Sequence, residues 1–207
     1  MRRRTLGLFR LAVAALAAAA LGTLAWHAGH TPGRGLPNYF SYLTIQSNLL
    51  GVVVFGTGGI AALTGRRGMP DHLRGATVLY LILVGAGYWS LVRNEPLSIP
   101  WANLVVHGAI PLAAVADWLI APPREHLTAR GTARWLIFPI VYLGYTFIRG
   151  PIVHWYPYSV ISPLKHGTPA ILVTIAGVAV ALPVLATIVA WAGNARLSRH
   201  RGHQRAV

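Results

Sequence analysis

The sequence predicts an all-α, polytopic integral membrane protein with six transmembrane helices and both termini in the cytoplasm. Of the 207 residues, 55% are hydrophobic and only 11% are charged, whereas soluble domains carry about 25% charged residues. Charge-free stretches such as 41–64 and 168–194 are long enough to cross a bilayer as helices. Basic residues gather between these stretches. Because no polar block is long enough to fold alone, residues 1–207 form one predicted membrane domain.

The first three predicted helices follow a basic N-terminus. The first covers about 6–26 and is rich in alanine. A signal peptide has the same charged-then-apolar pattern, but no small-residue cleavage site follows, so we favour a transmembrane helix. After a Gly/Pro loop at 27–38, the second helix covers about 39–64. It is polar in its first two turns and later rich in small residues, which permit close helix contact. The third helix covers about 75–91.

The last three predicted helices are bounded by basic or aromatic loops. The fourth covers about 101–120 and ends before Pro122–Pro123, because proline cannot continue a helix. The fifth covers about 135–148, and a long aromatic loop separates it from the sixth, at about 168–191. A basic tail at 195–207 closes the chain.

The distribution of Lys and Arg predicts the orientation of the helices. An even number of crossings places both termini on one side. Most of the 18 Lys and Arg residues fall in the termini and in the loops at 65–74 and 121–134. Cytoplasmic loops carry such an excess of positive charge, so we expect cytoplasmic termini and a location in the bacterial inner (cell) membrane. The basic residues on the opposite side are Arg34, Arg93, Arg149 and Lys165.

The net charge of +14 does not indicate a nucleic-acid partner. The basic clusters flank apolar segments, where they meet anionic headgroups, so membrane lipids are the expected partners; the oligomeric state stays open. The absence of cysteine excludes disulfides and thiolate metal sites. Haem held by two imidazoles would need a second histidine at the depth of His107, so no cofactor is expected. His27 and His30 are most simply surface histidines, with a weak loop metal site as the alternative.

The stretch 101–111, WANLVVHGAIP, carries the strongest indication of function. Asn103 and His107 are four residues apart, so on a helix they share one face. An imidazole at membrane depth is costly unless it faces protein or water, which makes His107 a candidate site residue. The alternative is that His107 only hydrogen-bonds a neighbouring helix.

Thr44 and Asn48 share a face near the start of the second predicted helix, and the topology places them at a similar depth to His107. A hydroxyl beside an imidazole is the minimal nucleophile–base pair, and the amide of Gln46 or Asn48 would hold the oxyanion. The alternatives are structural. Thr often bonds its own helix backbone, and Asn48 and Asn103 are equally consistent with helix-to-helix contacts.

The long loop after the fifth predicted helix lies on the same outer side. It contains Arg149 and the turn Tyr156–Pro157–Tyr158, which we predict to support the site or bind substrate. The alternative for the aromatic residues is an interfacial belt, where Tyr and Trp are enriched.

Three stretches together resemble a known family: YFSYLTIQSNLL at 39–50, WANLVVHGAIP at 101–111 and RGPIVHWYPYSVISP at 149–163. Their order and spacing are similar to those of the androgen-induced-protein and androgen-dependent-TFPI-regulating-protein family. Its members are six-span membrane proteins, and the likeness is closest to the bacterial relatives known as Pr-six-Pr membrane proteins. By topology the resemblance extends over nearly the whole chain.

The resemblance implies hydrolysis of fatty-acyl esters of hydroxy fatty acids, the activity of the eukaryotic members. In them a Thr near the outer start of the second span is the nucleophile and a His in the fourth span is the base. The matching patterns fall on Tyr42–Leu43–Thr44, on Trp101, Asn103 and His107, and on Tyr156–Pro157. Two segments depart from the family pattern: 108–111 is not Thr-rich, and 46–48 is not apolar.

The residues and the resemblance together predict a Thr-dependent intramembrane hydrolase of lipid esters. Thr44 is the expected nucleophile, His107 the general base, and Asn103 a residue that orients the imidazole; Glu95 is the one acid expected near that depth. The rival class is a non-enzymatic lipid or small-molecule binding or transport protein, whose cavity the same polar residues would line. The hydrolase requires a Thr44 hydroxyl within about 2.6–3.2 Å of a His107 ring nitrogen, directly or through one water.

Overall fold

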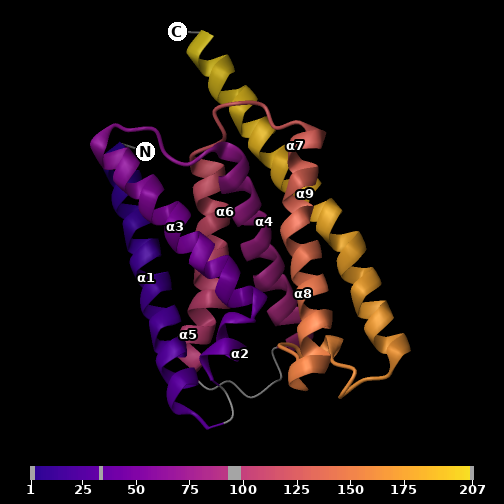
Figure 1. Ribbon diagram of the computed structural model, residues 1–207. Helices are drawn as coiled ribbons and strands as arrows, with labels where there is room; N and C mark the ends of the chain where they lie inside the picture. The colour runs from indigo at the N-terminus through magenta and orange to yellow at the C-terminus, as the bar shows by residue number, and fades with distance from the viewer. Residues whose placement is uncertain (1–2, 33–34, 93–98, 206–207) are drawn as a thin grey trace.

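The computed structural model describes residues 3–32, 35–92 and 99–205 (Figure 1). All regular secondary structure in these ranges is helical, and six helices are long and apolar enough to cross a membrane, as predicted. Arg34, Arg93 and Glu95 lie outside the described residues.

The N-terminal half of the bundle contains three of these six helices. They are α1 (Arg3–His30), α3 (Leu43–Thr64) and α4 (Asp71–Gly87), the last continued by the π-helical segment η1 (Tyr88–Val92). The short helix α2 (Leu36–Phe40) lies between α1 and α3.

Of the other three membrane-length helices, the fourth and fifth are each built from several helical segments, and the sixth is the long helix α9 (Thr168–Arg205). The fourth joins α5 (Pro100–Leu104), the π-helical η2 (Val105–Ala109) and α6 (Ile110–Ile120). The fifth joins α7 (Ala129–Ala133), the 3₁₀ segment η3 (Arg134–Leu136) and α8 (Ile137–Val153). The 3₁₀ turn η4 (Ser159–Ile161) precedes α9 (Thr168–Arg205).

The second membrane-length helix begins at Leu43, later than the predicted start near residue 39. Pro37 opens α2, and the Ser41 hydroxyl donates to the Pro37 carbonyl at 2.7 Å. Tyr42 then has an extended backbone, with φ −78° and ψ 130°, so the helix starts anew at the next residue. The restart places Thr44 in the first turn of α3, where backbone N–H groups have no partner within the helix.

Glycines bring α1 and α3 into close contact. A Cβ atom on Gly59 would lie 2.9 Å from the Gly7 carbonyl oxygen, and one on Gly7 would lie 3.1 Å from the Gly59 carbonyl oxygen. Only glycine permits this backbone approach, which is how small residues pack membrane helices. The small residues predicted to allow helix contact in the second span therefore serve that purpose at Gly59.

Five charged residues form a connected ion-pair cluster between α1, α4, α6 and the loop after α6. Asp117 accepts from Arg10 Nε at 2.6 Å and from Arg74 Nη2 at 3.1 Å. Arg74 also pairs with Asp71 at 3.2 Å, and the backbone N–H of Arg124 donates to Asp71 at 2.6 Å. In the sequence Arg10 and Arg74 stand in basic segments at the ends of apolar stretches, whereas in the structure both guanidinium groups are largely buried.

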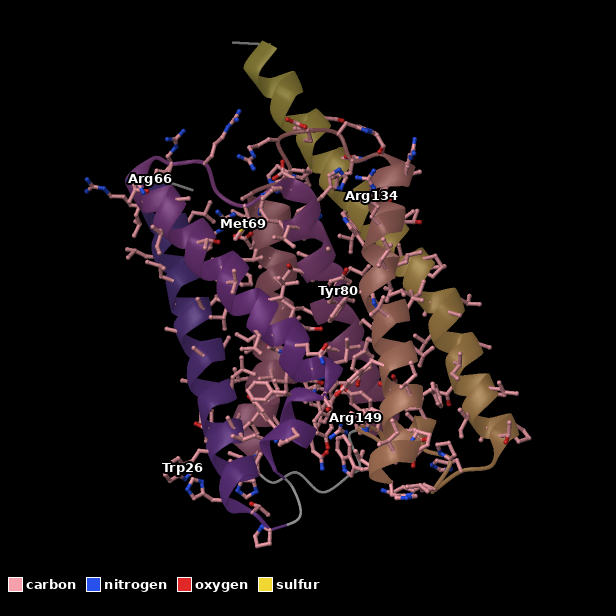
Figure 2. All side chains as sticks on the ribbon, in the orientation of Figure 1. Trp26, Arg66, Met69, Tyr80, Arg134 and Arg149 are labelled. Carbon is pink, nitrogen blue, oxygen red and sulfur yellow. The ribbon has the colours of Figure 1, made fainter. Side chains whose placement is uncertain are left out.

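Both termini lie at one end of the bundle, hereafter the termini end, and α2 lies at the opposite or far end (Figure 1). Figure 2 shows Arg66 and Arg134 at the termini end, and Trp26 and Arg149 at the far end. The first, second and fourth loops thus keep the arrangement that the Lys and Arg pattern requires.

Candidate functional site

A cavity of about 800 Å³ occupies the far half of the bundle. Its lining is mostly apolar and comes from α1 to α5, η1, η2, α8, α9, η4 and the loops on either side of η4. Five polar residues form what is here called the polar wall: Thr44, Asn103, His107, Tyr142 and Tyr158. The lining also includes other polar residues, among them His27, Asn38 and Lys165. A cavity of this size with a few convergent polar groups has the usual character of a ligand site.

Thr44 and His107 meet at this wall. The Thr44 Oγ1 atom lies 3.2 Å from His107 Nε2, and both side chains are buried. The two residues come from different membrane-length helices and are 63 positions apart. The distance lies at the upper limit of the reach that the hydrolase requires.

The other ring nitrogen of His107 identifies the tautomer. His107 Nδ1 lies 3.0 Å from the backbone carbonyl oxygen of Asn103. A carbonyl oxygen only accepts hydrogen bonds, so Nδ1 carries the proton and the neutral ring leaves Nε2 as an acceptor. The Thr44 hydroxyl therefore donates to Nε2, which is the arrangement that a general base needs.

Asn103 orients the imidazole through its backbone carbonyl. Its side chain does not hydrogen-bond to the ring. Its amide nitrogen instead donates to the Ile99 carbonyl at 2.9 Å. The ring is also held by Tyr88, which stacks on it with centroids 4.1 Å apart. No pattern in the sequence distinguished Tyr88 from the other aromatic residues near the helix ends.

His107 lies within η2, a π-helical segment where a regular α-helix was expected. Wide turns of this kind are rare and often occur at functional sites. The Trp89 indole N–H donates to the His107 carbonyl at 3.2 Å. A Cβ atom at Gly85 would lie 3.1 Å from that same oxygen, so α4 approaches η2 closely here.

Tyr158 completes the cluster around Thr44. Its hydroxyl oxygen accepts from the Thr44 backbone N–H at 3.2 Å and lies 3.2 Å from Thr44 Oγ1. Because the Thr44 proton points to His107, the phenol is the donor to Oγ1. Burial raises the pKa of the Tyr158 phenol, which keeps this proton in place at neutral pH. Among the predicted supporting residues, Tyr158 is the one in direct contact with the Thr44 hydroxyl.

Asn48 and Gln46 are not arranged as oxyanion donors. The Asn48 amide donates to the Thr44 carbonyl at 2.9 Å and to the Val106 carbonyl at 3.2 Å, so both its protons are used in joining α3 to η2. The Gln46 amide donates to the Phe40 carbonyl at 2.9 Å, at the end of α2. These positions agree with the alternative of helix-to-helix contacts.

Arg149 and Tyr156 support the surrounding structure and do not line the cavity. Arg149 donates to Asn38 Oδ1 at 2.7 Å and so fastens α8 to α2. The Tyr156 ring packs against Gly150, where a Cβ atom would collide with it.

Within the described ranges, no group of three or more His, Cys, Asp or Glu side chains is placed to hold a metal ion. Asp117 belongs to the ion-pair cluster and does not contact His107. The described site is therefore a hydroxyl, an imidazole and a phenol at the polar wall of an apolar cavity, in a bundle of six membrane-length helices. No protein-family model, curated protein or solved structure matches the chain.

Proposed function

We propose that this protein is an intramembrane hydrolase of fatty-acyl esters, with Thr44 as the nucleophile and His107 as the general base. The contact of 3.2 Å between Thr44 Oγ1 and His107 Nε2, with Nδ1 bonded to a carbonyl, is the observation that carries the proposal. The family resemblance supports the same two residues and the same substrate class.

The first half-reaction transfers the acyl group to the protein. His107 Nε2 takes the Thr44 hydroxyl proton as Oγ1 attacks the ester carbonyl carbon. The carbonyl oxygen becomes an oxyanion, and the Tyr158 phenol is close enough to the nucleophile to donate to it. When the intermediate collapses, the ester C–O bond breaks and the leaving alkoxide takes the proton from His107. The alcohol departs and an acyl-Thr44 ester remains.

The second half-reaction restores the protein with water. His107 takes a proton from the attacking water, whose oxygen bonds to the acyl carbon. The bond to Thr44 Oγ1 then breaks, Oγ1 regains the proton from His107, and a fatty acid is released. A backbone carbonyl stands where serine hydrolases have a carboxylate. It fixes the tautomer but stabilises the imidazolium less, so turnover is expected to be slow.

A fluorophosphonate probe tests the nucleophile directly. We expect purified protein in detergent to form a covalent adduct, with mass spectrometry locating the phosphonate on the peptide that contains Thr44. The His107→Ala variant should lose this labelling because the hydroxyl then has no base. Equal labelling of wild type and of both the Thr44→Ala and His107→Ala variants would remove the hydrolase proposal. The cavity of about 800 Å³ would then favour the alternative, a non-enzymatic lipid-binding protein.

Tyr158→Phe is expected to lower kcat by about 10²-fold with little change in KM, because one oxyanion donor is lost. The measurement is steady-state hydrolysis of a long-chain ester in mixed micelles. Tyr145→Phe is the matched control, since that hydroxyl bonds to Ser41 at 2.7 Å and does not line the cavity. A kcat for Tyr158→Phe equal to that of wild type would exclude the phenol from the reaction.

We further propose that the termini end faces the cytoplasm of a bacterium and that the site lies near the periplasmic face of the inner membrane. The positive charge at the termini end supports this orientation. Because the chain has no cysteine, single-cysteine variants report exposure cleanly. In spheroplasts, a membrane-impermeant maleimide should label His166→Cys and spare Arg67→Cys. The reverse pattern would invert the topology.

A further inference from the structure

One side of the cavity is lined mostly by apolar residues from two helices. Its members from α8 are Pro139, Ile140, Tyr142 and Leu143, and those from α9 are Thr174, Ile175, Val178, Ala179 and Leu182. Apart from Tyr142, which belongs to the polar wall, they carry no ionisable group. This side of the cavity is therefore apolar, in contrast to the polar wall that carries Thr44 and His107.

α8 and α9 do not close over this wall. Ile140 is 63% exposed and Val178 is 36% exposed, although both side chains line the cavity. Side chains that face both the cavity and the surroundings mark an opening between the two helices. Figure 1 shows α9 diverging from α8 towards the far end.

The other half of α9 is packed, so the opening is local. Leu182, Ala186 and Val189 are buried, and the Trp118 indole donates to the Val189 carbonyl at 2.9 Å. Contact between α9 and the bundle is thus firm towards the termini end, and it is restored at the far end beyond the cavity, where Ile171 is buried.

The opening lies at hydrocarbon depth. Val178 is about 15 Å along α9 from its first residue, and Ile140 is about 20 Å from the end of α8, at 1.5 Å per residue. A hydrocarbon core is about 30 Å thick, so both positions fall inside it and not at the headgroups. Outward-facing neighbours such as Val173 and Val180 are apolar and exposed, as a lipid-facing surface requires.

We propose that the gap between α8 and α9 is a lateral portal, through which an acyl chain of a membrane lipid ester passes from the far-end leaflet into the cavity. The apolar wall accepts the chain, and the ester group then reaches the polar wall. The chemical outcome rests on the proposed hydrolase function, but the passage of the chain does not.

Photocrosslinking tests the passage without catalysis. The Thr44→Ala protein is reconstituted in phosphatidylglycerol vesicles doped with a phospholipid that carries a diazirine in its acyl chain. Mass spectrometry should find crosslinks at Val84 and Tyr88, which are buried and line the cavity. The additional substitution Val178→Trp should abolish these crosslinks and leave those at Val141, on the lipid-facing surface, unchanged. The control substitution is Val173→Trp, because Val173 is exposed and lies outside the cavity lining. It should leave both the cavity crosslinks and the Val141 crosslinks in place.

Two results would overturn the portal: no crosslink at Val84 or Tyr88 in the parent, or crosslinks that persist in both Val178→Trp and Ile140→Trp. If hydrolysis is found, a second comparison applies. Val178→Trp in the wild-type background should reduce turnover of a long-chain ester held in vesicles far more than turnover of a short water-soluble ester. Failure of the hydrolase proposal leaves the crosslinking result intact, so the two proposals are judged separately.

Discussion

Replacing Thr44 with alanine is expected to reduce ester hydrolysis at least about 10³-fold, because the acyl group then has no acceptor on the protein. The substitution removes one methyl group and one hydroxyl from a buried side chain and leaves the backbone N–H that donates to Tyr158 in place. Thr44→Ser keeps the hydroxyl and should retain most of the activity. His107→Ala should cost about 10²–10⁴-fold, the usual contribution of a general base. The measurement is fatty-acid release from a panel of lipid esters by purified protein.

Thr77→Ala is the matched control for this experiment. Thr77 is as buried as Thr44 and donates to its own helix, at Leu73, but it lies beside the ion-pair cluster and not in the cavity. It should leave hydrolysis unchanged. Comparable losses in Thr44→Ala and Thr77→Ala would attribute the effect to general damage of the fold and count against the nucleophile.

Replacing Asp117 with alanine is expected to destabilise the protein by about 3–5 kcal/mol, because it leaves the largely buried Arg10 guanidinium without its carboxylate and removes one of the two carboxylates that pair with Arg74. The Arg10 and Arg74 side chains are 12% exposed and that of Asp117 is 9% exposed, so water screens these pairs little. Thermal unfolding in detergent, followed by tryptophan fluorescence, measures the loss as a fall in Tm.

Glu125→Gln is the control for Asp117, since it neutralises an exposed acid in the loop after α6. Its effect should stay within about 0.5 kcal/mol, as for most surface substitutions. A Tm for Asp117→Ala within the range of this control would show that the ion-pair cluster contributes little to stability. The cluster would then have to be explained by a role other than holding α1, α4 and α6 together.

The sequence was informative about depth along the membrane normal and much less so about direction around each helix. Lys and Arg alternation set which loops share a side, and counting residues from the helix ends placed Thr44 and His107 at similar depth. Whether their side chains face each other depends on how each helix is rotated, which packing at Gly85 and Tyr88 decides. The spacing of four residues between Thr44 and Asn48 predicted that they share a helix face. It did not predict that the Asn48 side-chain amide would donate to backbone carbonyls and so join α3 to η2.

Other features left no local signal. Arg10 and Asp117 are 107 positions apart, and each is unremarkable within its own segment. Hydropathy also began the third and fifth helices too late, near residues 75 and 135. In the structure the helices start in polar turns before these points, α4 at Asp71 and α7 at Ala129. Apolarity therefore locates the middle of a membrane helix better than its ends.

The wide turn at η2 explains how the fourth membrane-length helix keeps one inward stripe over its full length. Its buried residues recur at every fourth position: Ala102, Val106, Ile110, Ala114 and Trp118. On an unbroken α-helix, with 3.6 residues per turn, a four-residue stripe drifts by about 160° over these steps. Five-residue hydrogen bonding in the middle takes up part of that drift. Deleting a single residue there would rotate the two halves of the helix relative to each other. The imidazole of His107 would then turn away from Thr44, although both residues were still present in the sequence.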